Sequence, residues 1–541
     1  MTEDDTLTAE ELKPLFESLD HQPQRVYKRL MAVESLDGLV LHNQLSVVGL
    51  VIDVAIELGK EDGLIKGLEL AKEVDKEDAL TEAYQAQLYY SMGNAYSGLR
   101  RVRHGAGGDW RWENEELEHE IRLFRQALVE DRVEAIADER QCRILTNLGN
   151  ALSEVGRFIE AIDYWNDALT REPEFAQARG QRGIGYYNYG SMHYDPGHQF
   201  LLVKHAHQDL ILALDQSARL FPRMIEVFQK YIETIESRLS PERLSAGFEL
   251  EDYSLGDSAE EREYRQWCLD HRLFLNPLND LGSYPIAAQD IHHLASISST
   301  DENRIVSCIG LYNHMKQEFV SARYQLYDGL HAEDPHFSDR NVTLENTLDY
   351  PTHSLAVEKT KMAFRTAYSI FDKIGYFLNY YFDRSIPEHR VDFKRVWYTS
   401  QSRETLAPEF EEHKNWPLRG LFWLSKDLEY RNPMYVQNSL DPGAKELADI
   451  RNGLEHRYIK LHDTPWTPED NGETAQLVDK LATSLRRETL EQRALEIIQK
   501  LRAALIYLSL AIRSEEQVKN EDTDSEYGEL HFGPIDDKWK R

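Results

Sequence analysis

The sequence predicts an all-α protein in two parts, and three observations support this prediction. Apolar residues recur at spacings of three and four along almost the whole chain, and no clear alternating pattern of a half-buried strand appears. One segment in the first half has the glycine, tryptophan and proline spacing of a repeated helix pair. Residues 241–262 lack periodicity and mix Pro, Gly, Ser and acidic residues, which is typical of a linker. We therefore expect one helical region before this linker and another after it.

The composition is that of a folded protein with more than one core. The chain has 541 residues, of which 41% are hydrophobic and 29% are charged, and it is too long for one ordinary core. Its three cysteines are too few and too scattered for a disulfide framework, which suits a reducing compartment. The amino terminus lacks the basic-then-apolar order of a signal peptide. The longest apolar stretch, residues 503–512, is about half the length that spans a bilayer. These features predict a soluble cytoplasmic protein without a membrane partner.

The net charge of −32 limits how the protein can bind nucleic acid. Such a surface repels phosphates at long range. The charge therefore argues against a broad nucleic-acid-binding surface, but it does not exclude a small basic groove. Any function on RNA or DNA must depend on a local site.

The repeated helix pair is the segment LTNLGNALSEVGRFIEAIDYWNDALTREP, residues 145–173. Gly149 and Ala161 allow two antiparallel helices to approach closely, and Trp165 fills the space between them. Pro173 ends the second helix. Because one such pair cannot bury both of its faces, neighbouring pairs are expected.

Similar segments flank this pair at residues 93–127 and 183–213. The three together resemble tetratricopeptide (TPR) repeats, and we expect a TPR-like helical array over residues 1–240. The resemblance implies a concave surface that binds an unidentified protein partner or the second half of the chain. Helical periodicity resumes at residue 263 and continues to residue 514, and the acidic residues 515–541 are predicted to form a flexible tail.

The candidate site lies in ELADIRNGLEHRYIKLHD, residues 446–463, which the apolar spacing predicts to be one helix. Arg451, Asn452, Glu455 and His456 crowd two turns of it. The spacing of Arg451 and His456 also occurs twice elsewhere, in RSIPEH and RYIKLH, but only RNGLEH has a polar residue after the arginine within a periodic helix. The simpler interpretation is a solvated helix face with an ordinary ion pair. It leaves Gly453 unexplained, since a glycine within a helix costs about 1 kcal/mol relative to alanine.

The motif RNGLEH resembles the ribonuclease motif of the HEPN superfamily. The phrases YRQWCLDHRLFLNPLNDL, MKQEFVSARYQLYDG, NTLDYP and AFRTAYSIFDKIGYFLNYYF resemble the LA2681-like HEPN family. The resemblance covers residues 263–513, a HEPN domain that we place at 263–514. It implies a helical bundle that forms a homodimer and cuts RNA at the dimer interface without a metal or a cofactor. A prokaryotic defence or toxin role is also implied by the family, which includes inactive members.

The residue chemistry suits this reaction. RNA supplies its own nucleophile, the 2′-hydroxyl group, so the enzyme must only move protons and stabilise charge. His456 can take or give the proton, and Arg451 can hold the phosphate. Asn452 lies one turn before His456 and can orient it or the phosphate. Glu455 lies one turn after Arg451 and can hold its guanidinium in place.

Geometry on a single helix separates the two main groups. Five residues turn through about 500°, so Arg451 and His456 point about 140° apart and lie about 7.5 Å apart along the axis. One copy therefore presents them poorly to one phosphate. Two copies across a twofold axis would line one groove with both groups.

Other basic and histidine-rich segments are weaker candidates. Arg390, Lys394 and Arg395 alternate with aromatic residues, a pattern that can grip single-stranded RNA, and Arg457 is a further candidate RNA contact. The histidines at 193, 198, 205 and 207 are close in sequence, but His205 and His207 should point to opposite sides of a helix. For these four, a polar repeat loop is favoured over a metal site.

The sequence therefore predicts a metal-independent endoribonuclease that its repeats restrain or target. Two alternatives of a different class remain. One is a non-catalytic scaffold whose repeats bind a protein while the HEPN domain only dimerises. The other is an adaptor that senses RNA or a nucleotide without cutting.

Overall fold

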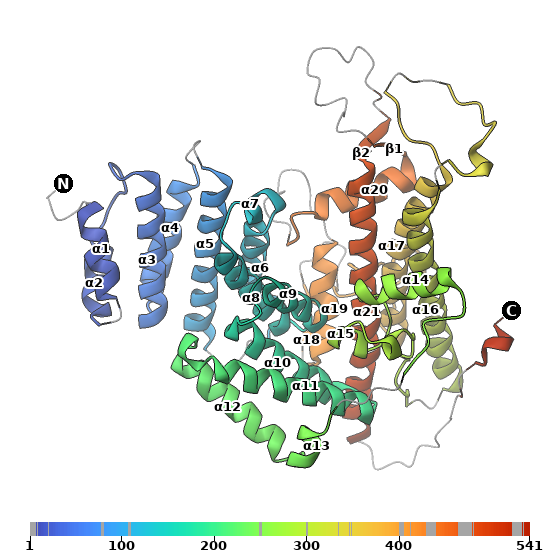
Figure 1. Cartoon of the computed structure of the whole chain (residues 1–541), viewed down its shortest axis with the longest axis horizontal. Helices are drawn as coiled ribbons and strands as arrows, with labels where there is room; N and C mark the ends of the chain where they lie inside the picture. Colours follow the sequence, from blue (N-terminus) through green and yellow to red (C-terminus); the bar gives the residue numbers. More distant parts are fainter. Residues whose placement is uncertain are drawn as a thin grey trace.

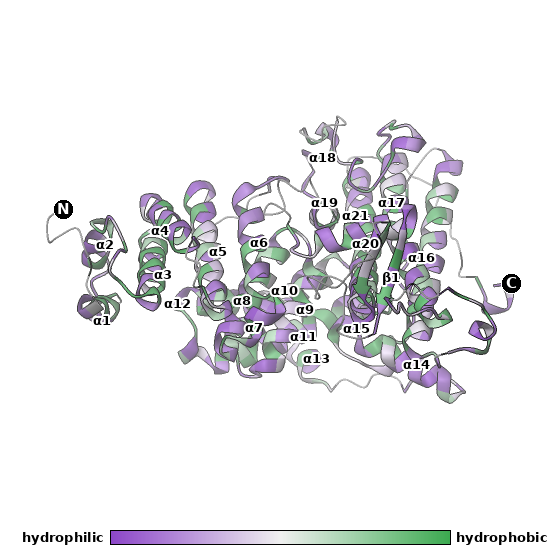
Figure 2. Cartoon of the chain, turned by 90° about the horizontal axis from the view of Figure 1, so that it is seen from above, coloured by the Kyte–Doolittle hydropathy of each residue, from purple (hydrophilic) through white to green (hydrophobic). Residues whose placement is uncertain are grey.

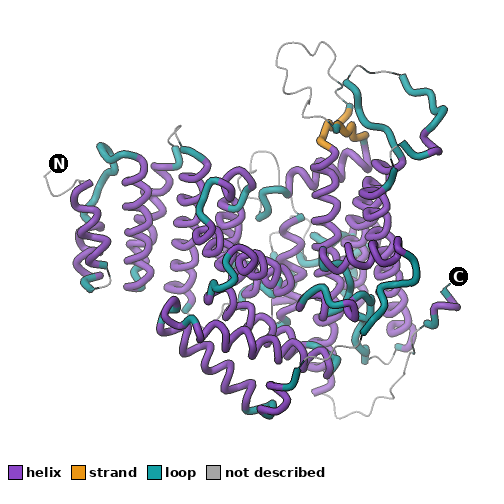
Figure 3. Tube along the Cα trace, in the orientation of Figure 1, coloured by secondary structure: helices purple, strands orange, loops and turns teal. Residues whose placement is uncertain are grey.

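A computed structural model gives the structure of the chain. It describes most of the sequence, in the following ranges: 7, 9–19, 21–76, 80–105, 110–247, 252–298, 301–333, 335–345, 347, 349–399, 405–411, 413–428, 440–463, 479, 481–521, 533 and 535–540. Within these ranges the chain forms twenty-one α-helices and one two-stranded sheet (Figures 1 and 3). The predicted all-α class is confirmed.

The first half of the chain is a row of helices that leads to a bundle (Figures 1 and 2). Its helices are α1 (Ala9–Ser18), α2 (Pro23–Met31), α3 (Leu41–Leu58), α4 (Glu61–Val74), α5 (Glu82–His104), α6 (Glu115–Ala127), α7 (Glu130–Glu134), α8 (Asp138–Glu154), α9 (Phe158–Arg171), α10 (Ala176–Met192), α11 (Pro196–Asp215), α12 (Pro222–Glu236) and α13 (Pro241–Ser245).

Three antiparallel pairs in this row, α5 with α6, α8 with α9 and α10 with α11, lie at the predicted positions. In each pair a glycine of the first helix faces a large side chain of the second. A Cβ atom at Gly149, for example, would lie 2.6 Å from the indole nitrogen of Trp165. The three contacts are Gly93 with Phe124, Gly149 with Trp165, and Gly183 with Leu210. Glycine is required at these positions because any side chain would force the two helices apart.

The second half is a bundle around the long C-terminal helix. Its elements are α14 (Ala259–Asp270), α15 (Leu278–Leu281), α16 (Glu302–His331), α17 (Leu355–Tyr381), α18 (Pro408–Glu411), α19 (Trp416–Asp427), α20 (Ala444–His456), β1 (Tyr458–His462), β2 (Ala482–Arg486) and α21 (Arg487–Glu521). Helices α16, α17 and α19 all pack against α21. Figure 1 shows α20 and the two strands at one end of this bundle.

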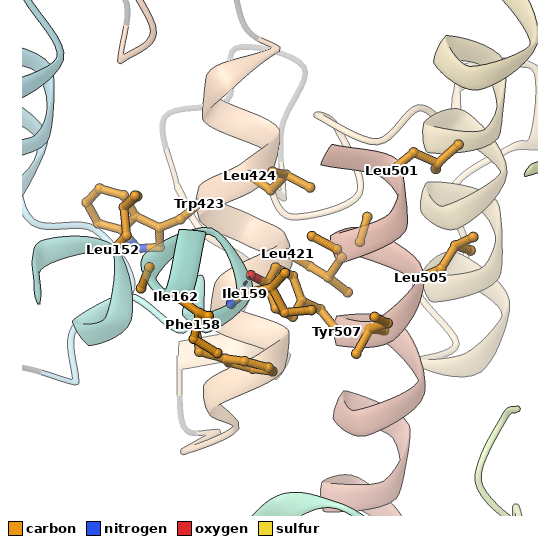
Figure 4. Close-up of a cluster of buried hydrophobic side chains, with 14 of the residues drawn as sticks. Leu152, Phe158, Ile159, Ile162, Leu421, Trp423, Leu424, Leu501, Leu505 and Tyr507 are labelled. Atoms are coloured by element: carbon orange, nitrogen blue, oxygen red, sulfur yellow. Dashed lines mark hydrogen bonds between the residues drawn. The ribbon is translucent and has the colours of Figure 1, made fainter. Parts of the chain in front are cut away.

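The two halves share one hydrophobic core. A continuous cluster of buried side chains runs from Trp112 to Ile512, while a smaller core is formed mainly by α1–α5. The ring of Phe158, at the start of α9, stacks on Trp416 of α19 with the ring centroids 4.9 Å apart. It meets Tyr507 of α21 edge-on with the centroids 4.8 Å apart. Figure 4 shows side chains of α8 and α9 against those of α19 and α21. The predicted linker is therefore not a boundary between two independent cores.

A buried charge network crosses the same contact. Asp427 at the end of α19 is fully buried and accepts hydrogen bonds from Arg125 (2.7 Å) and Arg157 (2.6 Å) of the first half. Lys500 of α21 lies 3.6 Å from the same carboxylate and 2.6 Å from Asp441, just before α20. Burial alone would raise the pKa of Asp427, but the three cations outweigh it and hold the pKa well below its usual range. This network therefore links the first half of the chain to the segment just before α20.

Both ends of the predicted second domain differ from the structure. Part of the predicted linker is helical, since α13 lies within it and α14 begins at Ala259, while residues 248–251 lie outside the described ranges. At the other end, α21 continues to Glu521. Glu515 is buried and accepts a hydrogen bond from Asn415 at 2.7 Å. The start of the predicted tail is thus part of the bundle, and residues 522–532, 534 and 541 lie outside the described ranges.

Two further expectations concern the environment of the protein. The three cysteines, Cys142, Cys268 and Cys308, are buried and free. Among the described helices, α3 has the length and hydropathy of a membrane span. Core helices of soluble proteins meet the same criteria, and the buried side chains of α3 lie in the N-terminal core. This finding is compatible with a soluble protein.

Candidate functional site

The helix that carries the site is shorter than predicted. α20 ends at His456, and residues 458–462, which the periodicity placed in the same helix, form strand β1. β1 pairs in parallel with β2, in the register Tyr458 with Ala482. The apolar spacing of three and four misled the prediction because the partner that makes this segment a strand lies more than twenty residues further along the chain.

Gly453 explains how the strand can follow the helix so closely. A Cβ atom at Gly453 would lie 2.7 Å from Cγ1 of Ile459. The bare helix face therefore accepts the side chain of Ile459 from β1 after the chain turns back at Arg457. The glycine that a solvated helix left unexplained has a packing role.

Arg451 faces the bundle. Its guanidinium lies over the ring of Tyr368 on α17, 5.2 Å from the centroid. Burial raises the pKa of Tyr368 to about 12, against the opposing charge of Arg451. Burial also raises the pKa of Asp372, one turn further along α17, and Arg451 opposes that shift too. The arginine is thus half-buried between α20 and α17, over an aromatic ring and near a carboxylate.

His456 faces the opposite side of α20. It lines an open pocket of about 400 Å³ whose other walls come from the same helix face, the residue after the helix and strand β2. The lining residues are Asp449, Asn452, Gly453, His456, Arg457 and Thr483. On a helical wheel, residues 449, 452, 453 and 456 fall within about 100° of one another, whereas residue 451 lies on the far side.

The structure therefore brings together only part of the predicted set. Asn452 and His456 share the pocket, and Arg457, predicted as a secondary RNA contact, is the arginine beside them. Arg451 is separated from His456 within one chain, as the spacing predicted. Asp449 and Thr483 were not predicted. Asp449 has a detectable signal, because it lies on the same helix face three residues before Asn452, whereas nothing in the sequence connects Thr483 to α20.

The predicted role of Glu455 is wrong in one respect. Glu455 does not pair with Arg451 but with Arg365 of α17, Nε to Oε1 at 3.2 Å. Both side chains are exposed, so the pair contributes little to stability. Its effect is to place a basic residue of α17 beside the face of α20 that also carries Arg451.

The basic segment at 390–395 loses its proposed aromatic contacts. The segment forms turns, and Phe393 and Trp397 are buried in the core, so neither ring is available to stack on a base. Its backbone packs on α17, where Asp372 accepts a hydrogen bond from the backbone N–H of Phe393 at 3.3 Å. Arg390 is exposed, Lys394 lies near the Asp372 carboxylate, and Arg395 donates to the carbonyl of Arg390 at 2.8 Å. The segment thus adjoins the Arg451 side of α20.

Histidines of the segment 193–207 lie in environments that differ from that of His456. His205 contacts the ring of Tyr186, whereas His207 lies 3.1 Å from Glu236, so the two point to different sides as predicted. His193 is buried in a ring cluster with His292, where burial holds its pKa at about 3. Across the described ranges, no group of three or more His, Cys, Asp or Glu side chains has the arrangement of a metal site.

Comparison with known proteins gives one match. No curated protein and no solved structure is similar enough to count as a match. Residues 299–515, which include α20 and its pocket, match the LA2681-like HEPN family, so this part of the chain is similar to LA2681-like HEPN domains.

Proposed function

We propose that the protein is a metal-independent endoribonuclease in which His456 moves the proton of the attacking 2′-hydroxyl group. The observation that carries this proposal is the open pocket in which His456, Asn452 and Arg457 lie together, within the HEPN-like residues. An exposed imidazole can take a proton from one group and give it to another. An arginine at the same pocket can bind the phosphate and the charge that develops on it. Asn452 can orient either group.

The direct test is RNA cleavage by the purified full chain. Cleavage should persist in excess EDTA and leave 2′,3′-cyclic phosphate and 5′-hydroxyl ends. His456→Ala should abolish it, and His389→Ala, which changes an exposed histidine outside the pocket, should not. Loss of cutting on chelation, with recovery in Mg²⁺ or Mn²⁺, would contradict the mechanism.

Arg451 enters the proposal through a homodimer. On one chain it faces α17, away from His456, so it can serve the pocket only of a second copy. Arg451→Ala and His456→Ala chains should each be inactive, and mixed dimers should regain part of the activity. A chain that cuts RNA while monomeric by light scattering would exclude the shared groove.

The helical row before the bundle is proposed to be a TPR array that binds a protein partner. The glycine contacts in its three helix pairs support this assignment, because close-packed pairs of this kind stack into extended concave surfaces. A partner bound there could restrain or target the nuclease, in a prokaryotic defence or toxin role. In that role, expression of the wild-type chain should arrest growth and expression of His456→Ala should not.

The second candidate function is an adaptor that binds RNA or a nucleotide without cutting it. The observation that favours it is the separation of Arg451 and His456 on opposite faces of α20. For this function, the wild type and His456→Ala should bind RNA equally and neither should cut it.

A further inference from the structure

The polar side chains of the His456 pocket have no partners among the described residues. Asp449, Asn452, His456, Arg457 and Thr483 make no side-chain hydrogen bond or ion pair with any other residue in the described ranges. Nearby carboxylates have partners, for example Asp349, which accepts from Lys460 at 2.7 Å. Unpaired polar groups that converge on one pocket can fix the orientation of a bound ligand.

The charges in this pocket suit a nucleotide better than a bare phosphate. Arg457 and His456 carry N–H groups that can donate hydrogen bonds to an anion. Asp449 lies seven residues before His456, about 10 Å along the helix axis. A carboxylate there would repel a phosphate, so it must face a group that carries hydrogen-bond donors. A nucleotide has both parts, with an anionic phosphate at one end and a base with N–H donors at the other.

We infer that the pocket is a base-specific subsite in which Asp449 binds the Watson–Crick edge of a guanine next to the cleaved phosphate. A carboxylate only accepts hydrogen bonds, through two adjacent oxygens. Guanine is the RNA base whose edge has two adjacent donors, N1–H and the N2 amino group, so both oxygens are used at once. The Watson–Crick edges of adenine, cytosine and uracil each offer only one donor group to the two carboxylate oxygens. Asn452 and Thr483 are near enough to complete the polar lining.

This inference rests on the proposed ribonuclease function, which places a phosphate beside His456, and it assigns the nucleotide that the site prefers. Single-stranded RNA is the form that can present such an edge, because its bases are not paired. Cuts should therefore fall next to unpaired guanines.

The test is equilibrium binding of 3′-GMP, 3′-AMP, 3′-CMP and 3′-UMP to the full chain by calorimetry, followed by sequencing of cleavage ends. The wild type should prefer 3′-GMP by roughly five- to 150-fold, the range for one good bidentate contact. Asp449→Asn should lose this preference and cut without base selectivity, since an amide offers only one acceptor. Asp463→Asn, the same change at an exposed residue outside the pocket, should keep it. Thermal unfolding should be the same for both variants.

The two failures are distinguishable. Equal affinity for all four nucleotides, preference for another base, or retained selectivity in Asp449→Asn would each overturn the guanine assignment, whether or not RNA is cut. Selective binding of 3′-GMP by a wild type that never cuts RNA would overturn the ribonuclease and leave the subsite standing. Cleavage without base preference would overturn the guanine subsite and leave the ribonuclease function standing.

Discussion

Asp427→Ala tests whether the two halves of the chain fold as one unit. Asp427 is fully buried and pairs with Arg125 and Arg157, which come from the other half. Its removal would leave Arg125 without an ion pair in the described ranges, although Arg157 would keep Glu160. Breaking a buried pair from one side costs about 3–5 kcal/mol. Because part of the network survives, we expect a loss of about 3 kcal/mol in the free energy of unfolding.

The measurement is urea unfolding followed by tryptophan fluorescence and by far-ultraviolet circular dichroism. The shared core should give one main transition in both signals for the wild type, at a clearly lower urea concentration for Asp427→Ala. The matched control is Glu139→Ala, which breaks an exposed ion pair with Arg143 and should cost less than about 1 kcal/mol. Equal effects of the two variants, or separate transitions for the two halves, would refute the account of the interface.

The contribution of Asp427 to the free energy of unfolding should depend on pH. The pKa of Asp427 in the folded state lies well below its usual range, whereas the unfolded value is about 3.9. The stabilisation is therefore complete above about pH 4 and is lost as the pH falls below it. The difference in stability between wild type and Asp427→Ala should shrink over that acidic range.

Three further outcomes follow from other contacts. A chain without residues 1–240 should aggregate on size-exclusion chromatography, because α19 and α21 lose their apolar partners; a soluble, cooperatively folded fragment would contradict the shared core. Gly453→Ala should lower the melting temperature, because displacing Ile459 costs about 1–3 kcal/mol and outweighs a helix gain of about 1 kcal/mol, whereas Gly310→Ala, on open helix surface, should raise it. Burial holds the pKa of His193 at about 3, below an unfolded value of about 6.5, so its stabilisation is lost as the pH falls below 6.5. His193→Asn should therefore remove about 2 kcal/mol of the stability loss between pH 7 and pH 5, as measured by urea midpoints.

Local periodicity predicted much of the fold. The helix pairs followed from spacing alone, because the glycine and its large partner lie in adjacent helices. The shared core does not follow from spacing. Phe158 and Tyr507 would be buried in one core or in two, and their contact joins segments about 350 residues apart. The composition of residues 241–262 therefore predicts a boundary between two cores, whereas one core runs across it.

The site was predicted in part for the same reason. Asn452 and His456 lie on one helix face, so their spacing brought them together. The one-turn spacing pairs Glu455 with Arg451, but Glu455 pairs instead with Arg365 on another helix, at 3.2 Å. Strand β1 and Thr483 depend on a pairing between distant segments, and no pattern within residues 446–463 contains that information.

The shared core also determines when during synthesis the protein can become complete. Ribosomes add about 5–20 residues per second, so the 541-residue chain takes roughly half a minute to two minutes to make. Until α21 leaves the ribosome, the apolar faces of α9 and α19 remain uncovered by α21. Asp441, just before α20, also lacks its ion pair with Lys500. Chains released early expose these faces to chaperones and proteases. The surroundings of the His456 pocket can therefore be complete only after α21 has been made.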